Sequence, residues 1–383
     1  MSIASNPFLS EQENLIRESA RKIAQEVVAK TAAERDRTSA WPHEEIKVVA
    51  DAGFMGMFAP AEMGGSDLSF LEYCLVLEEF AAADGGFATI MHVHNSSALV
   101  LRSSATEEQM KRYIPALASA KTIGAFLLSE PHAGSDTAAL RTTAKREGEH
   151  YVLNGSKQWI SNGDEAGFAF AVAATGEPGA RDRFSLFIID PAEPGYQCTR
   201  VESKLGQHTA HTAQITLDNL RVPAENLVGE EGRGYGKALS LLSDGRIAIA
   251  AIAIGIARAA LEAAVRYAKE REAYGKPIAA LQAVSFDLAD MATEIEVAEQ
   301  YMIYAARRKD AGLPNDKQAS IAKLYASEMA ERICSAAIQI HGGYGYVNDF
   351  PVERYYRDVR VTKIYEGTSH IQKYIIARRL LNE

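Results

Sequence analysis

YVLNGSKQWI, at residues 151–160, places two short β-rich runs on either side of an Asn-Gly pair. The runs are 151–153 and 157–160, and Asn154-Gly155 between them is a strong signal for a tight hairpin turn. Further apolar runs, separated by Gly, Pro and Asp, follow at 168–172, 184–189 and 215–217. The pattern therefore predicts that residues from about 121 to 228 form a sheet.

Outside this region the apolar residues recur with a helical period. Between about residues 10 and 120, Leu15, Ala20, Ile23, Val27 and Val28 fall close to a repeat of 3.6 residues. Residues 106–109, Thr-Glu-Glu-Gln, predict a capping box at the start of a further helix. From about residue 235 the chain is again helical, with alanine-rich amphipathic stretches. The pattern therefore predicts an α+β protein with helices, then a sheet, then helices.

Charge and cysteine content limit the possible partners. The chain has 41 Lys and Arg against 50 Asp and Glu, a formal net charge of −9. Because a nucleic-acid-binding surface needs a clustered basic face, we expect no nucleic-acid partner. Cys74, Cys198 and Cys334 are too widely spaced for a disulfide framework or a metal ligand set. We expect buried free thiols in a reducing compartment.

The sequence gives no indication of a membrane anchor or a secretory signal. The N-terminal segment, residues 1–28, lacks a long apolar core, and its acidic residues are unlike a transit peptide. The most apolar run, residues 247–257, is too short to cross a bilayer, so we expect a deeply buried helix and no membrane partner. The expected location is the cytoplasm, or an organelle matrix if an import peptide has been removed.

Two glycine clusters and a histidine pair suggest sites that their spacing does not support. EGRGYGKA, at 231–238, lacks the first glycine and the final Ser or Thr of a phosphate-binding loop, so we expect an interdomain loop. GGYG, at 342–345, follows a helical stretch instead of a strand, unlike a dinucleotide-binding fingerprint. His208 and His211 have no acidic or cysteine partner nearby in the sequence. We expect two solvated loop histidines and no metal site.

Three segments carry the most specific information. They are GAFLLSEPHAGSD at 124–136, IQIHGGYG at 338–345, and IYEGTSHIQ at 364–372, which is followed by Ala377-Arg378. Each alone could be a structural turn or a helix cap. Together, in this order and in a helix–sheet–helix chain, they resemble the signature segments of acyl-CoA dehydrogenases. The resemblance extends from Gln12 to Arg378.

This resemblance implies a fold, a cofactor and a reaction. The implied fold has an N-terminal helical domain (1–120), a middle β-barrel or sandwich domain (121–230) and a C-terminal four-helix-bundle domain (231–383). The implied cofactor is FAD, and the implied reaction is the α,β-dehydrogenation of an acyl-CoA to the 2-enoyl-CoA. HVHNS, at 92–96, resembles short-chain or short-branched-chain members of the family.

The implied reaction requires a base over the substrate α-carbon and donors for the thioester oxygen. The family uses one carboxylate, and Glu366 occupies the matching position, although an exposed loop glutamate is the alternative. Some branches of the family carry the base just before the arginine of LSDGR (242–246), where this chain has Gly245. Glu366 is therefore the base that the resemblance implies, and Gly367 beside it allows the backbone to approach the substrate.

The resemblance also assigns residues to FAD and to the acyl-CoA. Those expected at the isoalloxazine ring are Phe126, Leu128, Ser129, Trp159 and Ser161. Those expected toward the pyrophosphate and adenine are Arg271, Gln282, Gln339, Gly342, Gly343, Thr368 and His370. Those expected on the substrate are Ser135, Asp244, Arg246 and Gly367. Trp159 could instead be a core aromatic.

Partners and competing functions follow from the same resemblance. An electron-transfer flavoprotein is the expected electron acceptor, and the expected assembly is a dimer of dimers in which Arg271 reaches the FAD of the neighbouring chain. Two other functions stay open: a flavin monooxygenase or oxidase on the same fold, and a non-catalytic CoA-binding scaffold. Relatives of the first kind typically lack the glutamate, and a scaffold would tolerate its loss.

Overall fold

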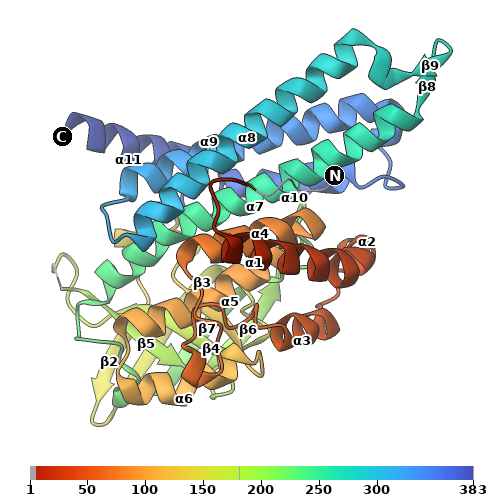
Figure 1. Ribbon diagram of the computed structural model, residues 1–383. Coiled ribbons are helices and arrows are strands. Elements are labelled where there is room, and N and C mark those ends of the chain that lie inside the picture. Colours follow the sequence, from red (N-terminus) through yellow and green to blue (C-terminus); the bar gives the residue numbers. More distant parts are fainter. Residues whose placement is uncertain (1–5, 181, 383) are drawn as a thin grey trace.

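In the computed structural model, which describes residues 6–180 and 182–382, helices precede and follow one curled sheet (Figure 1). Residues 1–5 of the N-terminal segment lie outside this description. The first helices are α1 (Glu11–Ile23), α2 (Ala29–Thr38), α3 (His43–Asp51), α4 (Phe70–Ala83), α5 (Gly85–Ser104) and α6 (Glu107–Ala118). The capping box predicted at Thr106 is confirmed at the start of α6. All residues of α4 are buried, which places this helix at the centre of the helical part.

The middle of the described chain forms a seven-stranded sheet in the order β1-β4-β2-β3-β7-β6, with β5 paired to β4. The strands are β1 (Ile123–Leu127), β2 (Thr143–Glu147), β3 (His150–Ser161), β4 (Ala166–Ala174), β5 (Phe184–Ile189), β6 (Tyr196–Val201) and β7 (Thr212–Pro223). Side chains of β4 alternate between two hydrophobic clusters, with Phe168 and Phe170 in one and Ala169 and Ala171 in the other. Because both faces of β4 are covered, its sequence is apolar throughout.

The predicted hairpin turn at Asn154-Gly155 is wrong. Strand β3 runs without interruption from His150 to Ser161, and Asn154 pairs with Thr143 of β2. The turn lies earlier, at Gly148, whose φ is 62°. A Cβ at position 155 would lie 2.4 Å from the side-chain oxygen of Thr142, and the pairing of β3 with β7 shifts register there. Asn-Gly therefore marks a bulge with a close approach of two backbones, not a turn.

The C-terminal part consists of long helices that pack side by side. They are α7 (Gly234–Glu270), α8 (Gln282–Asp310) and α9 (Asp316–His341), followed by the shorter α10 (Val352–Val359) and α11 (Ser369–Leu381). Strands β8 (Glu272–Ala273) and β9 (Lys276–Pro277) form a small hairpin that projects at the end of these helices away from the sheet (Figure 1). The helix–sheet–helix prediction is confirmed. The cluster at 231–238 is a turn followed by the first residues of α7.

Burial explains the apolar composition of α7. The helix is long and apolar enough to cross a membrane by length and composition, but 83% of its most apolar window is buried inside the protein. The predicted buried helix at 247–257 is thus confirmed. The cysteines are free, as expected, and Cys74 and Cys334 are buried. The expectation of burial is wrong for Cys198, because β6, on which it lies, is the last strand at one edge of the sheet.

Helices α4 and α7 approach each other closely at Gly255. A Cβ at this position would lie 2.1 Å from the backbone oxygen of Glu78 and 2.9 Å from the Cβ of Ala81. Nearby, Arg258 of α7 and Arg17 of α1 form ion pairs with the buried carboxylate of Glu78. Buried charges need such partners, so the ion pairs and the glycine contact together fix α1, α4 and α7 relative to one another.

We expect Gly255→Ala to destabilise the protein by roughly 1–3 kcal/mol, because the added methyl group forces α7 away from α4. The control is Gly236→Ala in the first turn of the same helix, where an added Cβ meets nothing within 4 Å. Denaturant unfolding of the two variants at equal protein and FAD concentrations measures the difference. Equal midpoints for both variants would contradict the close approach.

Candidate active site

Glu366 lies in an uncommon backbone conformation between a short 3₁₀ turn (Arg360–Lys363) and α11. Its φ is 52°, and that of Gly367 is 93°. A residue with a side chain adopts such values only when its surroundings hold it there, whereas glycine adopts them freely. Thr368 then caps α11 by accepting a hydrogen bond from the N–H of Ile371. The Glu366 side chain is 22% exposed, so it is not an exposed loop glutamate.

Buried donors from α9 and α11 hold this turn in place. Lys323 donates from Nζ to the carbonyl oxygen of Tyr365 at 2.7 Å and also to that of Gly367. Gln372 donates to the same Gly367 oxygen at 2.8 Å. Burial lowers the pKa of Lys323 to about 7, while the Glu366 carboxylate acts in the opposite direction. The residues on both sides of Glu366 are therefore fixed by one ammonium group.

The two carboxylate oxygens of Glu366 have different surroundings. Oε1 lies 2.8 Å from Nε2 of His92 on α5. Oε2 is buried and has no hydrogen-bond partner among the residues that the structure describes. A Cβ at position 245 would lie 1.6 Å from Oε2. Glycine at 245 thus leaves room for the carboxylate. Positions 245 and 366, the two alternatives that the resemblance offers for the base, are adjacent in space.

Asp244 and Arg246 of α7 lie close to this carboxylate. Asp244 forms an ion pair with Lys309 at 2.9 Å, and burial raises its pKa. Burial lowers the pKa of Arg246, and the carboxylates of Glu366, Asp316 and Asp244 oppose that effect. These two predicted substrate residues are therefore part of one charged cluster with Glu366. Of the other two predicted substrate residues, Gly367 follows Glu366 directly and Ser135 is exposed in the turn after β1.

The residues predicted at the isoalloxazine ring come together at the ends of β1 and β3. Phe126 is in β1, and Leu128 and Ser129 follow it directly. The backbone oxygen of Ser129 accepts a hydrogen bond from the N–H of Gln158, the residue before Trp159. Trp159 is 61% exposed with a φ of 65°, which excludes the alternative of a core aromatic.

Helix α5 connects this end of the sheet to Glu366. Asn162, just after Ser161 and the end of β3, donates to the backbone oxygens of Ile90 on α5 and Gly124 on β1. Two residues after Ile90, His92 contacts Glu366. The end of the sheet and the carboxylate therefore lie against neighbouring turns of one helix.

Most of the remaining predicted FAD residues gather elsewhere. Arg271, Gly342 and Gly343 line a cavity of about 630 Å³ at the end of the long helices that carries the β8–β9 hairpin (Figure 1). The Arg271 guanidinium lies over the ring of Tyr344. The exposed residues Gln282, first in α8, and Gln339, in the last turn of α9, flank this end. Thr368 and His370, predicted on the same side of FAD, do not lie there, because Thr368 caps α11 directly after the Glu366 turn and His370 is exposed in the first turn of that helix. Within one chain the predicted FAD residues thus form two separate groups.

Comparison with known proteins assigns the chain to a family. Residues 10–121, 125–220 and 232–381 match the family models for the N-terminal, middle and C-terminal domains of acyl-CoA dehydrogenase. An acyl-CoA dehydrogenase of Bacillus subtilis (strain 168) is 42% identical over 374 residues, which cover 97% of this chain and 99% of that relative. The chain belongs to the acyl-CoA dehydrogenase family.

Further similarities agree with this assignment. The mitochondrial short-chain specific acyl-CoA dehydrogenase of Mus musculus is 41% identical, with 97% of this chain and 91% of the relative covered. A solved structure described as the electron transferring flavoprotein of Acidaminococcus fermentans has a TM-score of 0.96 at 40% identity, with 99% of this chain and all of that chain covered. The acyl-CoA dehydrogenase family consists of FAD-dependent oxidoreductases that act on CH–CH groups, which confirms the predicted fold, cofactor and enzyme class.

The residues present fit FAD. Trp159 offers an exposed aromatic face beside the end of β1, suited to stacking on a planar ring. Arg271 offers an exposed guanidinium, suited to a pyrophosphate. Gly342 and Gly343 line the same cavity as Arg271, and a Cβ added at either would meet nothing within 4 Å. The backbone there is open to a ligand.

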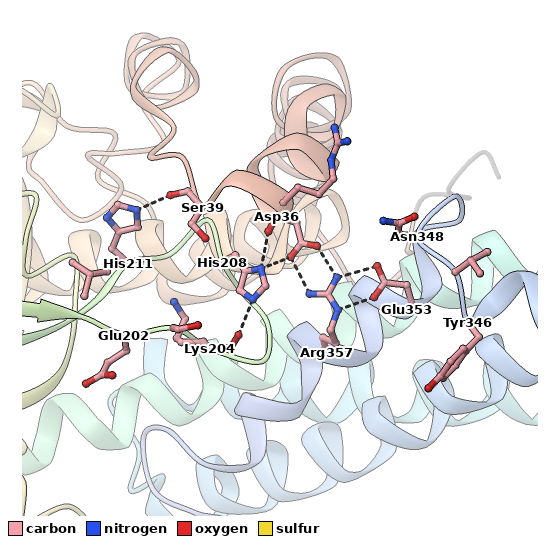
Figure 2. Close-up of a pocket in the computed structure, with 14 residues that line it drawn as sticks. Asp36, Ser39, Glu202, Lys204, His208, His211, Tyr346, Asn348, Glu353 and Arg357 are labelled. Atoms are coloured by element: carbon pink, nitrogen blue, oxygen red, sulfur yellow. Dashed lines mark hydrogen bonds and ion pairs between the residues drawn. The ribbon is translucent and has the colours of Figure 1, made fainter.

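His208 and His211 lie in a loop, as expected, but the expectation that they are solvated is wrong. Both lie at a second cavity, of about 640 Å³, where α2, the connection between β6 and β7, and α10 meet (Figure 2). The carboxylate of Asp36 lies between His208 and Arg357, at 3.1 Å and 2.6 Å. His211 contacts Asp164 at 2.5 Å, which raises the pKa of His211. The acidic partners are remote in sequence, and only the fold brings them near.

Asp164, Glu165 and His211 also place three potential metal-binding atoms within 4.8 Å of one another. The contact between His211 and Asp164 already uses two of these groups in an ion pair.

Sequence reasoning missed two residues that contact the Glu366 turn, His92 and Lys323. The sequence does mark Lys323 as unusual, because it lies with Ala319, Ala322 and Ala326 on the buried face of α9. A charged residue is rarely buried there without a partner. His92 was noted only for substrate size. The pair with Glu366 joins residues 274 positions apart, and no spacing in the sequence reveals such a contact.

We expect Lys323→Met to loosen the Glu366 turn, because the Tyr365 carbonyl loses its buried Lys323 donor and the Gly367 carbonyl keeps only Gln372. Hydrogen–deuterium exchange at residues 364–368 should become faster. Turnover of acyl-CoA should fall roughly 10- to 100-fold, because the turn that carries Glu366 is displaced. Lys373→Met, at an exposed position of α11, is the control and should change neither. Unchanged exchange and turnover in Lys323→Met would show that other contacts fix the turn.

Proposed function

We propose that this chain dehydrogenates a short-chain or short-branched-chain acyl-CoA to the 2-enoyl-CoA, with Glu366 as the base. The observation that carries the proposal is the held turn at Glu366. Its backbone is fixed on both sides by Lys323, and one carboxylate oxygen has no partner among the described residues. A base must be fixed in place and have an oxygen free to accept a proton, and the held turn and the unpartnered oxygen support this role.

The proposed roles follow from this geometry. The α C–H bond breaks and its proton passes to the Glu366 carboxylate, while the electron pair left on the α-carbon forms the Cα=Cβ bond. When bound, FAD supplies the acceptor for the hydride that leaves the β-carbon. The backbone N–H of Glu366 is the proposed donor to the thioester oxygen, and Gly367 lets the turn approach the substrate. Asp244, Arg246 and Ser135 are the proposed contacts of the CoA portion.

Short acyl chains are the proposed substrates, and two observations support them. The mouse relative is named short-chain specific. Residues 92–96, which resemble short-chain members, begin at the residue that contacts the Glu366 carboxylate. The presence of Glu366 disfavours a monooxygenase, an oxidase or a scaffold. Anaerobic mixing with butyryl-CoA tests for dehydrogenation, because bleaching of the flavin band without oxygen requires it and a scaffold would not bleach. Rapid return of the band when oxygen is then admitted would indicate an oxidase.

We expect Glu366→Gln to retain FAD and fold but to lose roughly two to three orders of magnitude or more in the rate of flavin reduction, because glutamine cannot take a proton. Stopped-flow absorbance with butyryl-CoA measures the rate. Glu108→Gln, at an exposed position of α6, is the matched control and should behave like the unmodified protein. A near-normal rate in Glu366→Gln would place the base elsewhere.

The two separate groups of FAD residues support a shared site. The sheet group lies beside Glu366, whereas Arg271, Gly342 and Gly343 lie at the opposite end of the long helices. We propose that the second group serves the FAD of a neighbouring chain, so that a dimer is the smallest active unit and a dimer of dimers the full assembly. The sheet group contains neither lysine nor arginine for the FAD pyrophosphate, and the neighbour's Arg271 would supply the cation.

Arg271→Ala should lose FAD on dilution and shift the assembly toward smaller species, because cofactor binding at a shared site stabilises the oligomer by mass action. Flavin absorbance after gel filtration and light scattering measure both effects. Lys276→Ala, an exposed residue of the same hairpin, is the control. A monomer that keeps FAD and full activity would exclude the shared site.

The proposal extends to the electron acceptor and the location. We propose an electron-transfer flavoprotein as the acceptor, as the family resemblance implies. A solved structure that contains a chain similar to this one is described by that name, which supports the proposal. We propose a reducing compartment, either the cytoplasm or an organelle matrix, because the described cysteines are free thiols. In this proposal the domains are 1–120, 121–230 with the flavin and thioester end, and 231–383 with Glu366.

A further inference from the structure

Three buried side chains form a continuous hydrogen-bonded line to the Glu366 carboxylate. The hydroxyl of Tyr73, on α4, lies 2.6 Å from Nδ1 of His92 on α5. Nε2 of His92 lies 2.8 Å from Oε1 of Glu366. Tyr73 is 1% exposed and His92 is 3% exposed, so water does not compete for either contact. The line ends at Oε1 of the Glu366 carboxylate. The other oxygen, Oε2, has no partner among the described residues.

The direction of these hydrogen bonds follows from what each group can donate. An ionised carboxylate only accepts, so the contact with Oε1 requires the hydrogen of His92 to be on Nε2. In the neutral ring Nδ1 then has a free lone pair and accepts the O–H of Tyr73. Burial raises the pKa of Tyr73 well above its usual range, which keeps its O–H in place. Every polar atom of the line is thereby satisfied except Oε2.

We propose that His92, with its tautomer fixed by Tyr73, is the positioning residue of the base, holding Oε1 of Glu366 and leaving Oε2 as the oxygen that receives the substrate α-proton. The inference rests on the proposed role of Glu366 and adds what that role leaves open, namely which oxygen reacts and what orients it. His92 does not touch the substrate in this scheme. It acts through the carboxylate.

Titratable groups, charged and neutral, surround the Glu366 carboxylate. Those that face it come from α4, α5, α7 and α9 and are Tyr73, His92, Asp244, Arg246 and Lys323. Lys323 donates to the backbone carbonyls on either side of Glu366, and Asp244 pairs with Lys309. Only the contact from His92 reaches a carboxylate oxygen of Glu366 within hydrogen-bond distance among the described residues.

Two substitutions at position 92 distinguish the loss of the hydrogen-bond donor from the loss of side-chain packing. Glutamine places an N–H donor near the position of Nε2, whereas leucine fills similar space without a donor. We expect His92→Leu to lower kcat roughly 10- to 100-fold with little change in KM, because a misplaced base slows the chemical step. His92→Gln should recover most of that loss, and Tyr73→Phe should give an intermediate value.

The pH profile provides a second readout. A donor to the carboxylate stabilises its charged form, so removing that donor lets the carboxylate take up a proton at higher pH. The acid limb of flavin reduction by butyryl-CoA should therefore move upward by about one pH unit in His92→Leu. In His92→Gln it should stay close to that of the unmodified protein.

Nitrogen NMR of the FAD-loaded protein with ¹⁵N-labelled histidine tests the tautomer without measuring activity. The signal that disappears in His92→Gln belongs to His92, and it should show a protonated Nε2 and an unprotonated Nδ1. In Tyr73→Phe the same signal should move toward a mixture of tautomers. A protonated Nδ1 at the working pH in the unmodified protein would overturn the assignment.

The kinetic outcomes distinguish this inference from the proposed function. If Glu366→Gln is inactive while His92→Leu keeps its rate and pH profile, Glu366 is the base and His92 has no positioning role. If His92→Leu and His92→Gln are both inactive while Glu366→Gln works, His92 is itself the base and both proposals fail. A change in KM alone in His92→Leu would make His92 a wall of the acyl pocket and overturn the positioning role.

Discussion

One buried ammonium group holds the backbone on both sides of Glu366, and the geometry of the site depends on it. A left-handed residue with a side chain stores strain of order 1–3 kcal/mol, and a buried lysine is unfavourable unless its hydrogens find acceptors. Hydrogen bonds from Lys323 to the carbonyls of Tyr365 and Gly367 hold the strained residue in place and also give the buried lysine its acceptors. Because Lys323 belongs to α9, the position of the turn follows the packing of the long helices.

Hydrogen bonds from helix α5 fix the Glu366 turn relative to the sheet. Its Ile90 carbonyl accepts from Asn162 at the end of β3, and Nδ1 of His94 accepts from the N–H of Gly124 on β1. Burial lowers the pKa of His94 to about 4, so this ring is neutral and can accept. His92 lies between these two contacts and reaches Glu366. A rigid helix thus sets the spacing between the aromatic face at Trp159 and the carboxylate, parts that lie far apart in the chain.

Sequence patterns predicted the fold class and failed at particular contacts. Helical periodicity, the Thr106 capping box and the buried run at 247–257 are local properties, and the structure confirms them. The local pattern predicts a turn at Asn154-Gly155. Glycine is needed there for a different reason, because the backbone of Thr142 lies too close for a side chain. His208 and His211 looked solvated because their partners, Asp36 and Asp164, are distant in sequence.

The sequence by itself determined the order of helices and sheet, the three signature segments and the choice of Glu366 as the proposed base. These features depend on residue type and on short spacings, which a single chain displays directly. Tertiary structure alone decided that Gly245 leaves room for Glu366, that Lys323 and His92 support it, and that the predicted FAD residues of one chain form two groups. Each of these depends on contacts between segments that are remote in the chain, and such contacts exist only once the helices have packed.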